Sequence, residues 1–214
     1  MKRLQYFLFL SLLVIGCAKE ENVKITDSEV GHSRIVFFPS IAIKGEHLII
    51  LQQGSTFTDP GAAATLNAAA AQFSVAGTVT TATPGVYNLV YEAKNAEGYS
   101  ATDFRTVVVI GNDVAAKDLS GKYLREATGV TSTWTKTGPG VYSIENPGGA
   151  AVGVGLKAIA VNYTGNKIAI PKQISPDLGQ ISTSTESYDP ATGTIKYALA
   201  AGGYGAALRT FVKQ

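Results

Sequence analysis

The string TPGVYNLVYEA, residues 83–93, combines the two signals that decide the fold. The dipeptide Pro84–Gly85 marks a turn. From Tyr87 to Ala93 every second residue is aromatic or apolar, and the other face is polar except for Val90. Because successive side chains of a strand point to opposite faces, this alternation predicts a strand with one buried face.

Similar short runs lie on both sides of this strand: RIVFF (34–38), HLIILQQ (47–53), FSVAGTVTT (73–81) and TDFRTVVVIG (102–111). They are rich in β-branched and aromatic residues, and Gly or Pro separates them. Runs of this kind, about 8–15 residues apart, predict an antiparallel β-sandwich over residues 33–112.

The second half of the chain has the same pattern of short strand-like runs separated by turn residues, with different sequences. Eight candidate strands run from SGKYLREA (120–127) to YGAALRTFVK (204–213), with Gly, Asn, Pro or Asp between them. They predict a second antiparallel domain over 118–214, a meander that closes into a barrel or a strongly curved sheet. The string NDVAAKD (112–118) is interpreted as a polar linker. The predicted fold class is therefore all-β.

Two resemblances refine these predictions. GSTFTDPGAAAT (54–65) together with residues 75–111 resembles the bacterial immunoglobulin-like modules of unknown function that recur in surface proteins, which implies a sandwich acting as spacer or binding platform. The second half, with DLSGKY (118–123) and IAIPKQ (168–173), resembles the small β-domains that follow such modules in surface lipoproteins of gut-type Gram-negative bacteria. That likeness implies association with capture or handling of polysaccharides.

The N-terminus has the pattern of an export signal. Lys2 and Arg3 precede an apolar run of about ten residues, which is well short of the roughly 20 needed for a membrane-spanning helix. Gly16 stands before Cys17, the single cysteine, and this resembles the lipobox of bacterial lipoproteins. We therefore expect a signal peptide over 1–16, an acylated Cys17 and a tether over 17–32, with acyl chains such as palmitate holding the protein on the membrane.

The residues directly after Cys17 bear on location. Ala18 is not the aspartate that retains many lipoproteins at the inner membrane, and Lys19–Glu21 resembles a short acidic surface-export tag. The sequence thus predicts an outer-membrane lipoprotein at the cell surface of a Gram-negative bacterium. Without the first 16 residues the chain has 16 basic and 16 acidic residues, from 18 Lys and Arg less Lys2 and Arg3. This near-neutral balance gives no electrostatic basis for binding nucleic acid.

Catalytic patterns are scarce in this sequence. With Cys17 assigned to lipid, neither His32 nor His47 has a cysteine partner, and the acidic residues of the second half fall mostly in or beside predicted turns. Asp59 and Asp103 offer too few oxygen ligands for calcium, and Asp59 is expected to cap a turn. We expect no enzyme activity, no cofactor and no metal.

Binding is the more favoured function, since aromatic rings beside polar groups are typical of carbohydrate sites. The candidates for ligand contact are Trp134, Tyr142 and Tyr204, although each of these rings could equally fill the core. The leading hypothesis is a non-enzymatic surface lipoprotein that binds an extracellular glycan, with the first module as spacer. One alternative is an accessory or scaffold subunit that contacts another outer-membrane protein through sheet edges, and another is an atypical glycan-active enzyme.

Overall fold

The computed structural model describes residues 29–30, 33–153 and 155–214. The chain forms two compact units, residues 1–37 and 38–214. In the first unit, β1 (Glu29–Val30) and β2 (Ser33–Arg34) form a short antiparallel pair. The predicted signal peptide, Cys17 and most of the predicted tether lie outside the described residues.

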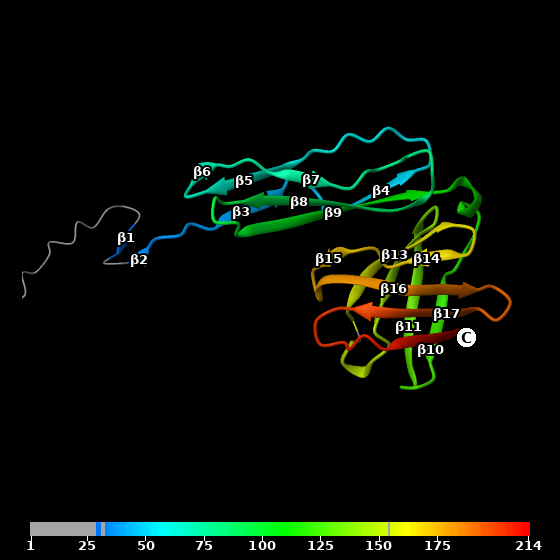
Figure 1. Ribbon diagram of the computed structural model, residues 1–214. Helices are drawn as coiled ribbons and strands as arrows, with labels where there is room; N and C mark the ends of the chain where they lie inside the picture. The colour runs from blue at the N-terminus through cyan, green and yellow to red at the C-terminus, as the bar shows by residue number, and fades with distance from the viewer. Residues whose placement is uncertain (1–28, 31–32, 154) are drawn as a thin grey trace, which may run out of the picture. The chain divides into compact units, whose positions relative to one another are not determined.

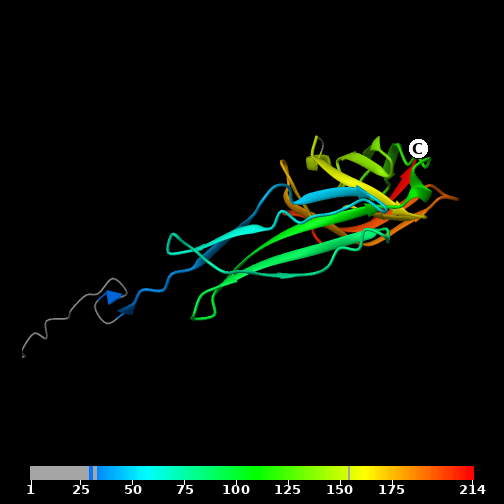
Figure 2. The same ribbon diagram turned by 90° about the horizontal axis from the view of Figure 1, so that it is seen from above.

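The second unit confirms the all-β prediction. Its described residues contain strands and two single 3-10 turns, η1 (Asn112–Val114) and η2 (Ala151–Gly153), and no α-helix. Within this described part, no helix reaches the length and hydropathy needed to cross a bilayer. The strands belong to an N-terminal sandwich and to a curled C-terminal sheet (Figures 1 and 2).

The sandwich consists of two sheets. The smaller contains β3 (Pro39–Ile43), β5 (Ala62–Leu66) and β6 (Ala69–Ala70) in that order. The larger has the order β4 (Leu48–Gln52), β9 (Ser100–Ile110), β8 (Gly85–Lys94) and β7 (Ser74–Ala76). Strand β4 runs parallel to β9, whereas β8 and β9 form the long antiparallel pair drawn in green in Figure 1.

The alternation along β8 is confirmed in this sandwich. Leu89, Tyr91 and Ala93 are buried, with at most 5% of each exposed, while Val90 on the opposite face is 41% exposed. The fully buried Arg105 of β9 donates Nη1 to Asp59 and to the Tyr91 hydroxyl. Its Nε and Nη2 donate to backbone carbonyls in the β3–β4 connection. One buried guanidinium therefore ties the two sheets and the turn at Asp59 together.

The curled sheet has nine strands. Their order is β14 (Lys167–Ala169), β13 (Lys157–Thr164), β12 (Val141–Glu145), β11 (Val130–Gly138), β10 (Gly121–Arg125), β18 (Leu208–Lys213), β17 (Thr194–Ala200), β16 (Gly179–Asp189) and β15 (Gln173–Ser175). All neighbours are antiparallel, and the first and last strands of the meander, β10 and β18, pair with each other.

Eight strands were expected. Pro171 lies between β14 and β15 in the string expected to form one strand, and a proline cannot donate to a ladder.

The two ends of the curled sheet approach each other (Figure 1). Thr183 of β16 donates its N–H to the carbonyl of Ile170, just after β14, at 3.0 Å. The side-chain amide of Gln173, in β15, accepts from the N–H of Ile159, in β13, at 2.9 Å and donates to the Ile159 carbonyl at 2.8 Å. The Gln173 side chain thus bonds to a part of the β13 backbone that the short strand β14 does not reach.

Candidate functional site

The sandwich and the curled sheet meet face to face. Every residue of β9 from Phe104 to Ile110 is buried, so both faces of this strand are covered. One face lies in the sandwich core. The other contributes to an apolar group that we call the junction cluster, which consists of Val108, Ile110, Val114, Val161 and Ala169.

Hydrogen bonds reinforce the junction. Gly111 N–H donates to the carbonyl of Tyr163 at 2.7 Å, and Gly165 N–H donates to Asp113 Oδ2 at 2.6 Å. Lys172 Nζ lies 3.8 Å from the centre of the Phe104 ring, which is cation–π geometry. The expectation of a separate polar linker over 112–118 is wrong in one respect, because Val114 within it is fully buried in the junction cluster.

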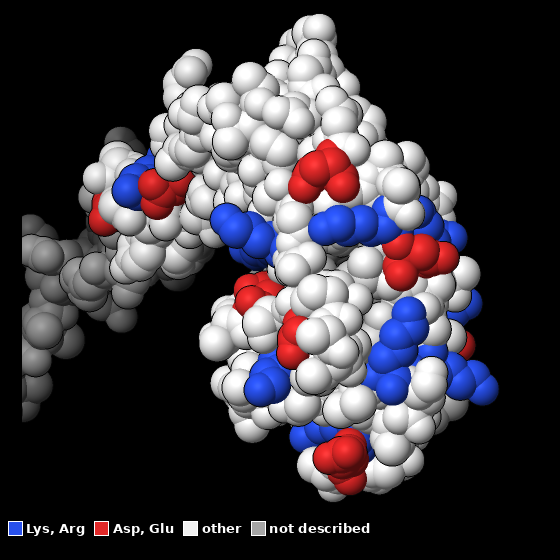
Figure 3. Space-filling view, turned by 90° about the vertical axis from the view of Figure 1, so that its right-hand side faces the viewer, with Lys and Arg blue, Asp and Glu red and all other residues white. Residues whose placement is uncertain are grey.

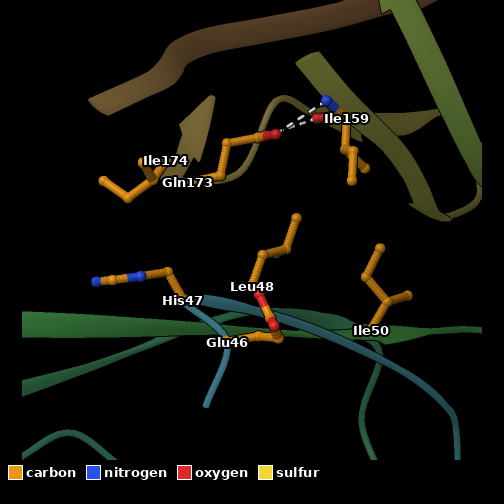
Figure 4. A pocket seen from close by; sticks show the side chains of 7 residues that line it. All are labelled: Glu46, His47, Leu48, Ile50, Ile159, Gln173 and Ile174. Carbon is orange, nitrogen blue, oxygen red and sulfur yellow. Dashed lines mark hydrogen bonds between the residues drawn. The ribbon is translucent and has the colours of Figure 1, made fainter. Parts of the chain in front are cut away.

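A groove of about 200 Å³ lies on the β4 side of the junction (Figure 4). Leu48 and Ile50 of β4 point toward Ile159 of β13, and Ile174 completes the facing wall. His47 and Gln173 are among its polar members. The Gln173 amide is bonded to the backbone of Ile159, as the dashed lines in Figure 4 show, and His47 Nε2 lies 3.0 Å from Asp103 Oδ1. Two of the three polar side chains of this groove, all but Glu46, are therefore already engaged.

A second cleft, of about 320 Å³, lies on the β8 side. We call it the junction cleft; its lining is Val86, Asn88, Tyr163, Ile168, Ala169, Ile170, Pro171, Lys172, Ser182, Thr183 and Glu186. Its walls come from β8 of the sandwich and from β13, β14 and β16 of the curled sheet. The cleft therefore needs both modules.

A β-bulge places the acidic group of the junction cleft. The β16–β17 register shifts between Ser184 and Ser187, and Thr185 has a φ of 57°. Bulges reorient a side chain locally. Here Glu186 Oε1 accepts from Thr183 Oγ1 at 2.7 Å. Thr183 Oγ1 also accepts from the N–H of Ile170 at 2.9 Å, so this carboxylate is anchored to the closing edge of the sheet.

Tyr163 is the aromatic side chain of the junction cleft and is half-buried. Burial raises the pKa of its hydroxyl, and the nearby carboxylate of Glu186 raises it further. The hydroxyl consequently stays protonated at neutral pH and can donate a hydrogen bond. On the facing wall, Asn88 lines the cleft, and its Oδ1 accepts from Thr106 Oγ1 at 3.0 Å.

Comparison with known proteins bears on the sandwich. Residues 41–109 match the family model described as "Bacterial surface protein, Ig-like domain". This segment is similar to bacterial surface Ig-like domains. The Ig-like domain spans almost all of β3 to β9, and the predicted resemblance is confirmed for this part of the chain.

Among solved structures, a lipoprotein from Bacteroides thetaiotaomicron, BT2262, is 26% identical. The match covers 83% of this chain and 100% of that one, with a TM-score of 0.37. The M60 catalytic domain with two CBM51 domains of Clostridium perfringens ZmpB is 12% identical, and the match covers 82% of this chain and 23% of that one, with a TM-score of 0.27. Superpositions with TM-scores this low do not establish a shared fold. No curated protein matches the chain.

The structure corrects the expectation for two of the predicted ligand contacts. Trp134 and Tyr142 are 2% and 0% exposed and lie in the core of the curled sheet. Their ring centres are 5.7 Å apart, and Tyr123 packs on Trp134 at the same separation. Tyr142 donates to the carbonyl of Lys117 at 3.2 Å. Rings that alternate inward along β11 and β12 fill the concave interior and present no face to a glycan.

The third predicted contact, Tyr204, is half-buried and lies in the β17–β18 connection, where it lines an open hollow of about 360 Å³. The structure does not bring it onto a common surface with Trp134 and Tyr142. Conversely, Glu186 is one of the acidic residues of the second half that were expected in or beside turns, and Asn88 and Lys172 were not among the predicted ligand contacts. No local pattern marks these residues, because they meet only across the junction.

Two acidic residues of the Ig-like domain have structural partners. Asp59 Oδ1 accepts from the N–H of Gly61 at 3.1 Å, so the predicted turn cap is confirmed. His47 Nε2 lies 3.0 Å from Asp103 Oδ1. Burial alone would raise the pKa of Asp103, but the N–H groups of Ile43 and Phe104 and the His47 ring lower it below its ordinary value. Among the described residues, no three His, Cys, Asp or Glu side chains gather as a possible metal site.

Proposed function

We propose that the protein is an outer-membrane lipoprotein, anchored through Cys17 and displayed at the cell surface, that binds an extracellular glycan in the junction cleft without acting on it. The positive start, short apolar run and Gly16–Cys17 pair support the lipid anchor. The match of residues 41–109 to a family of bacterial surface domains supports the extracellular setting.

The composition of the junction cleft is the observation on which this proposal rests. A sugar ring has apolar C–H faces that pack on aromatic rings, and hydroxyl groups that both donate and accept. Tyr163 supplies the ring, Glu186 an acceptor, and Asn88 and Lys172 donors. The volume of about 320 Å³ lies at the lower end of the ~300–1,000 Å³ usual for small-molecule sites. One or two sugar units would fit such a space.

The acid content of the cleft supports binding rather than hydrolysis. Glycoside hydrolases generally need two carboxyl groups, one on each side of the scissile bond. Among the described residues that line the cleft, Glu186 is the one carboxylate. On the face in Figure 3, basic and acidic side chains lie interspersed, which favours a neutral or mixed ligand over a polyanion such as nucleic acid.

The two-sided construction of the cleft gives the Ig-like domain more than a spacer role. Val86 and Asn88 form one wall and the curled sheet forms the other. Because the junction cluster and its hydrogen bonds hold both modules together, the walls are already positioned before a ligand arrives. Preorganisation of this kind favours affinity.

The test is binding to a polysaccharide panel by glycan array, followed by calorimetry with the best ligand. Glu186→Gln removes a charged acceptor, and Asn88→Ala removes an exposed donor. Each should weaken binding by about tenfold, the effect of losing one hydrogen bond of about 1.4 kcal/mol. Glu126→Gln, in the β10–β11 turn outside the cleft, is the matched control. Binding unchanged in both cleft variants, or absent across the panel, would refute the proposal.

A second candidate function, a scaffold subunit bound to another outer-membrane protein, is favoured by one sheet edge. Strand β7 is the outer strand of its sheet, and beside it Phe73, Val75 and Val90 are 36%, 45% and 41% exposed. Unpaired edges with apolar side chains are templates for strand addition. Co-purification of a membrane partner that is lost in Val75→Lys would favour this function.

A further inference from the structure

Two arginines point into the concave interior at one end of the curled sheet. Arg125 is the last residue of β10, in the same alternation as the buried Tyr123, and Arg209 belongs to β18, in the same alternation as the buried Phe211. Strand pairing places Arg209 opposite Tyr197, which is also buried. Both guanidinium groups therefore come from positions that otherwise hold core residues.

Neither arginine has an acidic partner in the part of the chain that the structure describes. Arg209 is 5% exposed and donates to the carbonyls of Ala207 at 3.0 Å and Gly205 at 3.1 Å. Arg125 donates to the carbonyls of Gly148 and Gly149, both at 3.3 Å. Among the described residues, no carboxylate lies within 4.0 Å of either guanidinium. Burial lowers the pKa of Arg209, and the charge of Arg125 lowers it further.

Two donors at this end of the sheet are buried and have no partner among the described residues. They are Arg209 Nε and the hydroxyl of Tyr204. The Tyr204 ring lies beside the Arg209 guanidinium, with 5.8 Å between ring centre and Cζ. The Tyr204 ring also packs so closely on the Gly148 backbone that a Cβ atom added at Gly148 would collide with it. Buried donors are nearly always satisfied in proteins, so these two donors at one end of the sheet indicate a missing acceptor.

The cover over these groups is thin. Residues 201–207, AGGYGAA, carry no side chain larger than a methyl group except Tyr204. Tyr204, Leu199 and this segment line the open hollow of about 360 Å³. Backbone carbonyls from this loop and from the 146–150 turn accept from the arginines. Neither arginine lines the hollow itself, so what separates the hollow from Arg209 is this segment of Gly and Ala residues, which an anion would have to displace.

The geometry points to an oxyanion site: we infer that Arg209, Arg125 and Tyr204 bind a carboxylate or sulfate group of the kind carried by acidic sugars. The guanidinium Nε and an adjacent Nη form the edge that binds a carboxylate with two parallel hydrogen bonds. Tyr204 would supply a third. This site is separate from the junction cleft, and its existence does not depend on the proposed function there.

The test uses the purified full-length protein in detergent, with sodium glucuronate and sodium sulfate as probes against sodium chloride of equal ionic strength, and glucose as neutral control. A bound anion should raise the melting temperature saturably, which neither chloride nor glucose should do. Stronger stabilisation by glucuronate identifies a sugar carboxylate, and stronger stabilisation by sulfate identifies a sulfate group. Absence of any effect beyond that of chloride would overturn the inference.

Variants separate a built site from general attraction of anions. Arg125→Met, at a half-exposed position, and Tyr204→Phe should each weaken the binding of the stabilising anion at least tenfold. Tyr204→Phe should leave the anion-free melting temperature unchanged or higher, since the hydroxyl it removes has no partner among the described residues. Lys196→Met on the exposed side of β17 is the charge control, and Glu186→Gln should have no effect. Equal loss in Lys196→Met and Arg125→Met, or no loss in Tyr204→Phe, would count against the site.

Discussion

Replacing Asp59 by Asn removes the carboxylate that pairs with the buried guanidinium of Arg105. The substitution isolates charge from geometry, because an Asn side-chain oxygen can still accept from the N–H of Gly61 and keep the turn. Arg105 would remain fully buried with the carbonyls of Lys44 and Glu46 and the Tyr91 hydroxyl, but without a counter-charge.

The magnitude is set by burial. Breaking a buried ion pair by removing one partner costs about 3–5 kcal/mol. The Asp59 side chain is 27% exposed, so water screens part of the interaction and the lower end, about 3 kcal/mol, applies. Against a total stability of about 5–15 kcal/mol, this loss is large. The double variant Asp59→Asn with Arg105→Met should lose little more than the worse single variant, because the stranded charge is then gone.

Urea unfolding followed by circular dichroism measures these free energies. Asp189→Asn is the matched control: Asp189 also precedes a proline and accepts from the N–H two residues on, Ala191 at 2.9 Å, but it is exposed in the β16–β17 turn. It should change stability by less than about 0.5 kcal/mol. A loss below about 1 kcal/mol in Asp59→Asn, or single-variant losses that add within about 0.5 kcal/mol, would refute the reasoning.

Four further predictions concern other parts of the chain. Val161→Asp places an unpaired charge in the junction cluster and should split thermal unfolding, followed by calorimetry, into two transitions; a single unsplit transition would contradict it. Gly148→Ala should destabilise the fold by about 1–3 kcal/mol through its collision with Tyr204, which a lower melting temperature would report, and adding Tyr204→Ala should recover part of that loss. The pKa of Asp103 is lowered in the folded state. The ionised Asp103 therefore stabilises the fold above its ordinary pKa of 3.8, and this stabilisation is lost as the pH falls through the folded-state pKa. Asp103→Asn should flatten the acid side of a curve of unfolding free energy against pH. Cys17→Ala should abolish palmitate labelling and leave the protein soluble in the periplasm, whereas a wild type without lipid would overturn the predicted anchor.

Local sequence patterns predicted individual strands well where only one face is buried. The string from Tyr87 to Ala93 alternates because one side of β8 packs in the sandwich, and turn residues such as Asp59 bond within a few residues of themselves. The VVVI run of residues 107–110 carries a different signal. An uninterrupted apolar run indicates a strand covered on both faces, and this part of β9 is buried where the sandwich meets the curled sheet (Figure 1).

The candidate sites were much less predictable. Trp134 was predicted as a ligand contact because its neighbours in TSTWTKT are polar, yet the adjacent threonines point outward from β11 while Trp134 points into the core. Tyr142 on β12 is buried in the same core. Asn88, Tyr163 and Glu186 lie 75 and 23 residues apart along the chain, as the differences of their numbers show, and meet only when the two modules dock. Nothing within a short window could reveal that meeting.

Local patterns along the chain predicted the all-β class, the strand-rich halves, the turn chemistry and a lipid anchor at Cys17, because each depends on residues close together in the sequence. The three-dimensional arrangement was needed to show which aromatic rings are core, that Val114 belongs to a buried junction, and that Arg125 and Arg209 lie at one end of the curled sheet without an acidic partner among the described residues. Those outcomes depend on how the strands are ordered and how far the sheet curls. Contacts between distant segments fix both, and periodicity along a single strand does not report them.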